Sequence, residues 1–108
     1  MSNSRIRVKV AEAARHGEQL HIKTLIMHHM ETGLRSDAAG EPISRHIINR
    51  FVCTYDGEIV FDAELNPAVA ANPYLEFNVV ASHSGTLSFQ WFEDGGRIYT
   101  AERQIDVT

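Results

Sequence analysis

Thr-Leu-Ser-Phe-Gln-Trp-Phe, residues 86–92, is the stretch of this sequence that decides its fold class. Leu87, Phe89 and Trp91 alternate with small or polar residues, so three large apolar side chains point to the same face of an extended chain. This period of two predicts a β-strand that buries one face and exposes the other. We expect these three side chains to lie in the core, together with Phe51, Ile22 and Phe77.

The same alternation recurs along the chain and predicts further strands. Ile6, Val8 and Val10 alternate with Arg and Lys, which predicts a half-buried strand with a basic outer face. Asp56-Gly57 predicts a two-residue hairpin turn, because glycine tolerates the positive φ that a type I′ turn requires. The expected strands comprise residues 6–10, 20–27, 47–55, 59–65, 74–81, 86–92 and 99–107.

These strands and the turns between them predict an all-β fold, an immunoglobulin-like antiparallel β-sandwich of about seven strands. A chain of 108 residues has the size of one domain, so residues 1–108 are expected to form a single sandwich. Residues 11–15 are the best helix candidate, but this segment is too short to form a helix that is stable alone.

Composition argues against several classes of function. The net charge is −4 and there is no run of basic residues, so no nucleic-acid partner is expected. No apolar run approaches the roughly 18 residues of a membrane span, so no membrane insertion is expected. The first ten residues contain no apolar signal segment, and by themselves they predict a cytoplasmic protein.

Cys53 is the only cysteine and the one nucleophile that merits consideration. It shares a strand face with Ile47, Phe51 and Tyr55, which predicts a small buried core residue and not a reactive thiol. No Ser-His-Asp order, paired-carboxylate motif or glycine-rich phosphate loop is apparent. We therefore expect a protein that is not an enzyme and holds no cofactor.

Residues 28–44 form a long segment between two expected strands, and loops of this length are usually functional or mobile. Met27, His28, His29 and Met30 at its start are soft metal ligands, and they suggest an alternative function, a periplasmic copper-binding β-sandwich. Adjacent histidines on a strand point to opposite faces, which argues against a shared ion and against a metal site.

Three arginines, Arg35, Arg45 and Arg50, carry planar guanidinium groups that suit an oxyanion. The alternative is that they form ion pairs with the acidic residues of the same segment. The apolar Met30 and Leu34 lie beside Arg35 in a segment that should be hydrated. We therefore predict that Met30, Leu34 and Arg35 belong to a partner-binding surface.

Several segments carry a resemblance to a known family. They are Met-Glu-Thr-Gly-Leu-Arg at 30–35, residues 45–51, Ala-Asn-Pro-Tyr-Leu-Glu-Phe at 71–77, Trp-Phe-Glu-Asp-Gly-Gly at 91–96 and Tyr-Thr-Ala at 99–101. In this order they resemble the SoxZ family, whose members are the small subunits of the SoxYZ sulfur-carrier complex of bacterial thiosulfate oxidation. The resemblance extends over about residues 6–107.

The resemblance implies a non-catalytic subunit that forms a heterodimer with a SoxY-type subunit and docks transiently to other enzymes of thiosulfate oxidation. SoxY would carry the sulfur on a cysteine of its C-terminal tail. The printed sequence ends in residues 104–108 without such a cysteine, so we expect this chain to be the partner. The family implies a periplasmic location reached by co-export with SoxY, in contrast to the cytoplasmic prediction. The isolated subunit is expected to expose an apolar patch and to self-associate weakly.

Overall fold

The structure is a computed structural model of the chain, and it describes residues 5–27, 36–41, 47–66 and 73–108. These residues form strands and turns, and no helix occurs among them. In the part of the chain that is described, no helix that could cross a membrane is found. The strands are β1 (Arg5–Lys9), β2 (Ala13–Ala14), β3 (Gln19–Met27), β4 (Ile48–Tyr55), β5 (Glu58–Glu64), β6 (Tyr74–Val80), β7 (Gly85–Glu93) and β8 (Ile98–Val107).

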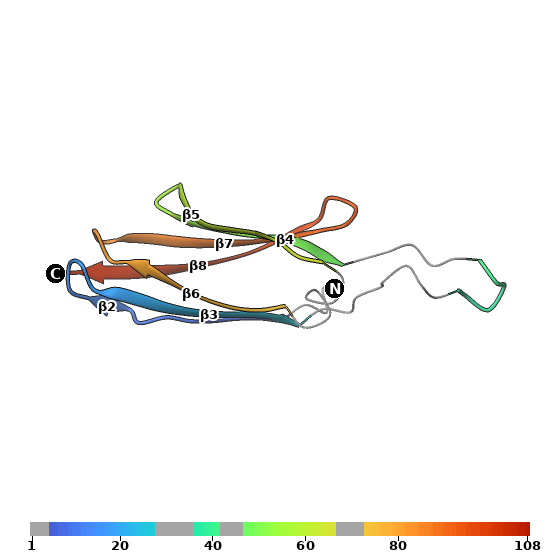
Figure 1. Cartoon of the computed structure of the whole chain (residues 1–108), viewed down its shortest axis with the longest axis horizontal. Helices are drawn as coiled ribbons and strands as arrows, with labels where there is room; N and C mark the ends of the chain where they lie inside the picture. Colours follow the sequence, from blue (N-terminus) through green and yellow to red (C-terminus); the bar gives the residue numbers. More distant parts are fainter. Residues whose placement is uncertain (1–4, 28–35, 42–46, 67–72) are drawn as a thin grey trace.

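The strands form two sheets that pack face to face (Figure 1). One sheet has three strands in the order β1-β3-β6, and the other has five in the order β2-β8-β7-β4-β5. All pairings are antiparallel except the short parallel contact between β2 and β8. The all-β, immunoglobulin-like sandwich predicted from the sequence is therefore confirmed. The strand that the alternation missed is β2, whose two residues are too few to show a period.

The core lies between the sheets and is centred on β7, which pairs with both β4 and β8. Leu87, Phe89 and Trp91 are fully buried, as predicted. Phe51 of β4 is the cross-strand neighbour of Trp91, and the two ring centroids lie 5.1 Å apart. The opposite sheet contributes a fully buried row of its own from β3: Leu20, Ile22, Thr24 and Ile26.

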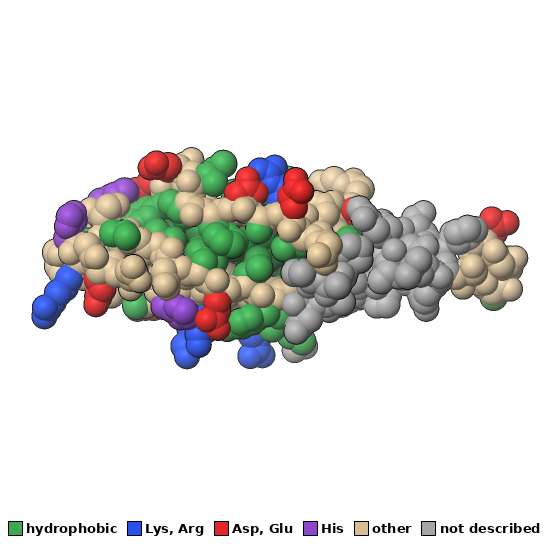
Figure 2. Space-filling view, in the orientation of Figure 1, with side chains coloured by type: hydrophobic (Ala, Val, Ile, Leu, Met, Phe, Trp, Pro, Cys, Tyr) green, Lys and Arg blue, Asp and Glu red, His purple; other side chains and the backbone are tan. Residues whose placement is uncertain are grey.

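Phe77 was expected in the core, and it is only half-buried. It lies on β6, an edge strand of the three-stranded sheet, where it stacks on Phe61 of the edge strand β5 with ring centroids 4.3 Å apart. Edge strands have a neighbour on one side only, so their inward side chains cover the margin of the core. On the face seen in Figure 2, apolar side chains are visible between the two layers.

The β4–β5 hairpin turn has the geometry that the sequence predicted. Asp56 and Gly57 have φ angles of 48° and 86°, and a type I′ turn requires positive φ at both positions. A second glycine is needed where the β6–β7 connection passes this turn. A Cβ atom on Gly85 would overlap the Asp56 carboxylate, so a side chain there would displace that carboxylate.

Replacing Phe51 by alanine should reduce the free energy of unfolding by about 3–5 kcal/mol, since it removes a buried ring and leaves a cavity. Phe51 packs against Phe61, Phe77, Phe89 and Trp91. Urea unfolding followed by tryptophan fluorescence measures the change. Thr100→Ala on the exposed face of β8 is the control and should shift stability by less than about 0.5 kcal/mol. A loss below about 1 kcal/mol for Phe51→Ala would contradict this description of the core.

Candidate functional site

The single thiol is part of the core. Cys53 is fully buried on β4, where it pairs with Phe89 of β7 and Phe61 of β5. Burial in these apolar surroundings raises the pKa of the Cys53 thiol to about 12. A thiol with such a pKa holds almost no nucleophilic thiolate near neutral pH. The structure thus agrees with the sequence prediction of a structural cysteine.

Arg50, one of the three candidate anion-binding arginines, is engaged in an ion pair. Its Nε and a terminal nitrogen donate to the two carboxylate oxygens of Asp62 over 2.9 and 2.6 Å. This bidentate contact lowers the pKa of Asp62 and raises that of Arg50. The guanidinium also lies 5.5 Å from the ring centroid of Phe92. The two guanidinium nitrogens of Arg50 that contact Asp62 are therefore not available to bind an oxyanion in the same bidentate way.

Two acidic residues hold the strand that follows the long 28–46 segment. The Asp94 carboxylate accepts hydrogen bonds from the Ile47 backbone N–H over 3.1 Å and from Asn49 Nδ2 over 2.9 Å. The neighbouring Glu93 is buried, and Tyr99 donates to its Oε2 over 2.6 Å. These contacts fix the start of β4 against the β7–β8 hairpin.

A cluster of polar side chains joins two turns at the other end of the sandwich. His83 Nε2 lies 2.9 Å from Asp56 Oδ2, and its Nδ1 lies 2.9 Å from Ser82 Oγ. Tyr55 donates its hydroxyl proton to the His83 carbonyl oxygen. The Thr86 amide donates to Asp56 Oδ1 over 2.8 Å, and this bond, followed by the contact with His83, lowers the pKa of Asp56. His83 and Asp56 are half-exposed, and their contacts join one turn to the other. We therefore assign them a structural role.

The outer face of the three-stranded sheet is basic at one side. Arg7 and Lys9 project from β1, and Lys23 projects from β3. Lys9 and Lys23 are direct cross-strand partners, while Arg7 pairs with Leu25. Like charges directly opposite one another destabilise a sheet, whereas opposite charges there contribute roughly 0.2–1 kcal/mol. Lys23 has an opposite charge, Glu76, as its cross-strand partner on β6, so the like-charge pair lies on the β1 side alone.

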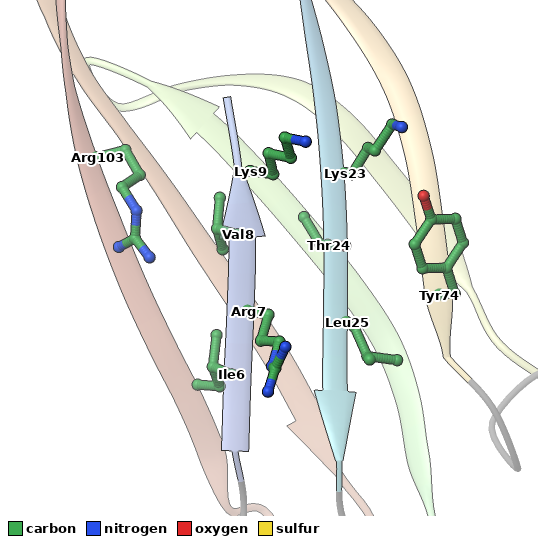
Figure 3. Close-up of a pocket in the computed structure, with 9 residues that line it drawn as sticks. All are labelled: Ile6, Arg7, Val8, Lys9, Lys23, Thr24, Leu25, Tyr74 and Arg103. Atoms are coloured by element: carbon green, nitrogen blue, oxygen red, sulfur yellow. The ribbon is translucent and has the colours of Figure 1, made fainter. Parts of the chain in front are cut away.

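An open hollow lies over this part of the sheet (Figure 3). Its volume is about 520 Å³, and its lining includes Arg7, Lys9, Lys23, Leu25 and Tyr74. Figure 3 shows that the lysines come from the adjacent strands β1 and β3 and that the tyrosine lies on β6. A second hollow of about 400 Å³ is lined by the same two lysines together with Val10, Ala11 and His21. The two hollows thus meet at the Lys9–Lys23 pair.

The carboxylate opposite Lys23 is occupied by other partners. Glu76 lies across from Lys23 on β6, and Tyr74 donates to its Oε1 over 2.6 Å. Its Oε2 lies 3.1 Å from His21 Nε2. The tyrosine contact is the main cause that lowers the pKa of Glu76, and Lys23 adds to it. Among the described residues, none of Arg7, Lys9 and Lys23 has a carboxylate oxygen within 4 Å.

Several residues that the sequence analysis proposed lie outside the described residues. These include the predicted partner-binding residues Met30, Leu34 and Arg35, and the candidate ligands His28 and His29. Their roles remain predictions. The remaining candidate ligand is Met27, which ends β3 with a half-exposed side chain. Within the described ranges, no three His, Cys, Asp or Glu side chains gather as a metal site would require.

A family model described as "Sulphur oxidation protein SoxZ" matches residues 6–104. This match covers most of the chain, including all eight strands except the ends of β1 and β8. The chain belongs to the SoxZ family. It is thus a Sox sulfur-oxidation protein. No curated protein sequence matches it.

Solved structures share the fold of this SoxZ-family chain. The sulfur carrier protein SoxY from Chlorobium limicola f thiosulfatophilum has a TM-score of 0.68 and 16% identity, with 95% of this chain and 78% of that chain covered. The superoxide reductase (neelaredoxin) from Ignicoccus hospitalis has a TM-score of 0.69 and 15% identity, with coverages of 95% and 80%. A putative superoxide reductase from Thermotoga maritima has a TM-score of 0.65, 15% identity and coverages of 95% and 85%. At these identities the likeness concerns the fold alone.

The motifs that resemble the SoxZ family include residues that stabilise the fold. Trp91 is the central core ring, and Glu93 and Asp94 hold the β7–β8 hairpin and the start of β4. Sequence reasoning missed these contacts, because the partners of Asp94 are 45 and 47 residues away along the chain. It also missed the basic face as a site, although the alternation in 5–10 had indicated one basic strand. The cross-strand register was needed to place Lys23 opposite Lys9.

The Cys53 thiol should react slowly with a thiol reagent in the native protein, even at pH 9.0, its ordinary pKa. Burial keeps the reagent out, and the raised pKa keeps the sulfur protonated. Absorbance of the released chromophore follows the reaction. Adding denaturant is the control, and it should give rapid reaction of one thiol per chain. Rapid labelling of the native protein would show that Cys53 is accessible and would overturn the structural assignment.

Proposed function

We propose that this chain is the non-catalytic subunit of a periplasmic sulfur-carrier complex, in which it forms a heterodimer with a SoxY-type subunit. The observation that carries the proposal is the SoxZ family match over residues 6–104. The SoxY-type partner would hold sulfur intermediates of thiosulfate oxidation on a cysteine, and this chain would hold and present it. Co-export with that partner would bring it to the periplasm.

The burial and the raised pKa of Cys53 support a role in which this chain does not itself carry the sulfur. A sulfur carrier forms its adduct through a thiolate, which requires exposure and a pKa near or below the ambient pH. Cys53 has neither, since it is fully buried and its pKa is about 12. If the complex carries sulfur covalently on a thiol, the attachment site must belong to another chain.

The described surface also supports a role in assembly. Several apolar side chains are half-exposed, on four different strands: Met27, Ile59, Tyr74, Val80 and Ile98. Single exposed apolar residues are ordinary, but permanent interfaces are built from such residues where they gather. The predicted partner-binding residues Met30, Leu34 and Arg35 follow directly after Met27 in the sequence. We propose that this segment contributes to the contact with the SoxY-type subunit.

Co-expression with the SoxY-type subunit of the same source should give a complex with one copy of each chain. After reaction with thiosulfate in the reconstituted pathway, intact-mass spectrometry should find the added sulfur on the SoxY-type chain and none on this one. The matched variant is Cys53→Ser, which should lower stability modestly and leave sulfur loading unchanged. Failure of the two wild-type chains to associate, or an adduct on Cys53, would refute the proposed function.

Arg35→Glu should weaken assembly with the SoxY-type subunit, since it reverses a charge in the predicted partner-binding segment. The melting temperature of the isolated subunit should hardly change, because surface charge substitutions usually cost under about 0.5 kcal/mol. Sedimentation of mixtures measures the affinity, and calorimetry measures the melting temperature. Arg15→Glu, an equal charge reversal in the exposed turn before β3, is the control and should assemble normally. Wild-type affinity of the Arg35 variant, or a collapse of its folding, would remove the segment from the interface.

A further inference from the structure

We infer that the basic outer face of the three-stranded sheet docks an acidic segment of a second protein that meets the complex transiently. The basic face is defined by Arg7, Lys9 and Lys23, with Leu25 and Tyr74 beside them. This inference deepens the proposed function, because a carrier subunit must meet the enzymes that load and unload its complex. It concerns residues other than those of the 28–44 segment that we propose for the contact with the SoxY-type partner.

The first argument is the sign of the charges. The chain has ten basic and fourteen acidic residues, yet Lys9 and Lys23 are placed as direct cross-strand partners with Arg7 next to them. Lysine on an edge strand commonly protects the edge from pairing with another chain, and this explains Lys9 on β1. It does not explain Lys23, because β3 is the central strand of its sheet, where Lys23 has Glu76 on one side and Lys9 on the other. An anionic group between the two strands would relieve the repulsion between the ammonium groups.

The second argument is the shape of the face. Two open hollows of about 520 and 400 Å³ meet at the lysine pair, and together they extend from residue 6 of β1 to residue 11, two residues after the strand ends. Five residues of a strand span roughly 16 Å, which matches a short extended peptide and exceeds a single oxyanion. Leu25, Tyr74 and Val10 add apolar lining to the cationic groups. The face therefore suits a segment that combines carboxylates with apolar side chains.

The remaining charges favour protein over nucleic acid. Four cations line the first hollow, since Arg103 of β8 joins Arg7, Lys9 and Lys23. With the neighbouring Glu76 they make a small mixed patch, whereas a phosphate backbone requires a longer basic footprint. Arg7 and Lys9 are exposed and Lys23 is half-buried, so the attraction is screened by salt. Exposed charge complementarity of this kind speeds association more than it tightens binding. These properties suit a partner that arrives, reacts and leaves.

The test measures binding of a fluorescein-labelled deca-glutamate peptide to the full-length chain by fluorescence anisotropy. At about 20 mM salt the wild-type chain should bind the peptide, and raising the salt to about 200 mM should weaken binding several-fold, since the Debye length falls. Neutralising both lysines, Lys9→Gln with Lys23→Gln, should raise the dissociation constant at least roughly ten-fold. The same double substitution should not weaken any binding of deca-lysine, which the acidic residues of the chain would attract.

The matched control neutralises two cations outside the face, Arg15→Gln with Arg97→Gln, and should change the dissociation constant less than roughly two-fold. Both positions are exposed and lie outside both hollows. Amide chemical-shift changes on peptide addition should map to β1 and β3 and spare β5. The inference fails if the lysine variant binds like wild type, if the control loses as much affinity, or if the shifts map elsewhere. Stronger lysine-dependent binding to phosphatidylglycerol vesicles than to the peptide would assign the face to a lipid surface and overturn it.

The complex with the SoxY-type subunit separates this inference from the proposed function. The Lys9→Gln, Lys23→Gln variant should still assemble with that subunit, and the assembled complex should still bind the peptide. If assembly blocks the peptide, the face belongs to the permanent interface and the transient-docking inference is wrong. If the wild-type chains do not assemble at all, the proposed function fails, while the peptide measurement on the isolated chain still decides whether the face is an acidic-segment site.

Discussion

This fold depends on the packing of its two sheets against each other. In the core between them, Phe51 and Trp91 lie on neighbouring strands of the five-stranded sheet, with ring centroids 5.1 Å apart. Strand β7 supplies three consecutive inward side chains, and β4 and β8 pair with it on either side. Burial of these rings provides the main stabilising free energy, because removal of apolar surface from water dominates folding. The three-stranded sheet completes the core by covering this face with its own buried row.

The packing of the core also determines which groups of the protein are accessible to other molecules. It places Cys53, the one cysteine of the chain, in the core, where desolvation keeps the thiol protonated and therefore unreactive. The sandwich presents edge strands, half-exposed apolar side chains and a basic face, and such features serve recognition more readily than catalysis.

Some residues of the family motifs stabilise the sandwich, and others lie outside the residues that the structure describes. Trp91, Glu93 and Asp94 belong to the first group, since they fill the core, anchor the β7–β8 hairpin and fix the start of β4. The Met-Glu-Thr-Gly-Leu-Arg segment at 30–35 lies outside the described residues. A motif that identifies a family is therefore not by itself a list of functional residues. Geometry separates a residue that holds the scaffold from one that contacts a partner.

The sequence by itself determined the sandwich, its inward faces, the Asp56-Gly57 turn and the burial of Cys53, because period-two alternation and turn chemistry are local properties of the chain. Only the tertiary structure decided which strands are neighbours. It left Phe77 at the margin of the core, since β6 lies at an edge. It also placed Lys9 opposite Lys23, a pairing set by register between separate strands and not by any spacing along the chain. Cross-strand partners far apart in sequence leave no periodic trace, so the basic face became visible only when the sheet was assembled.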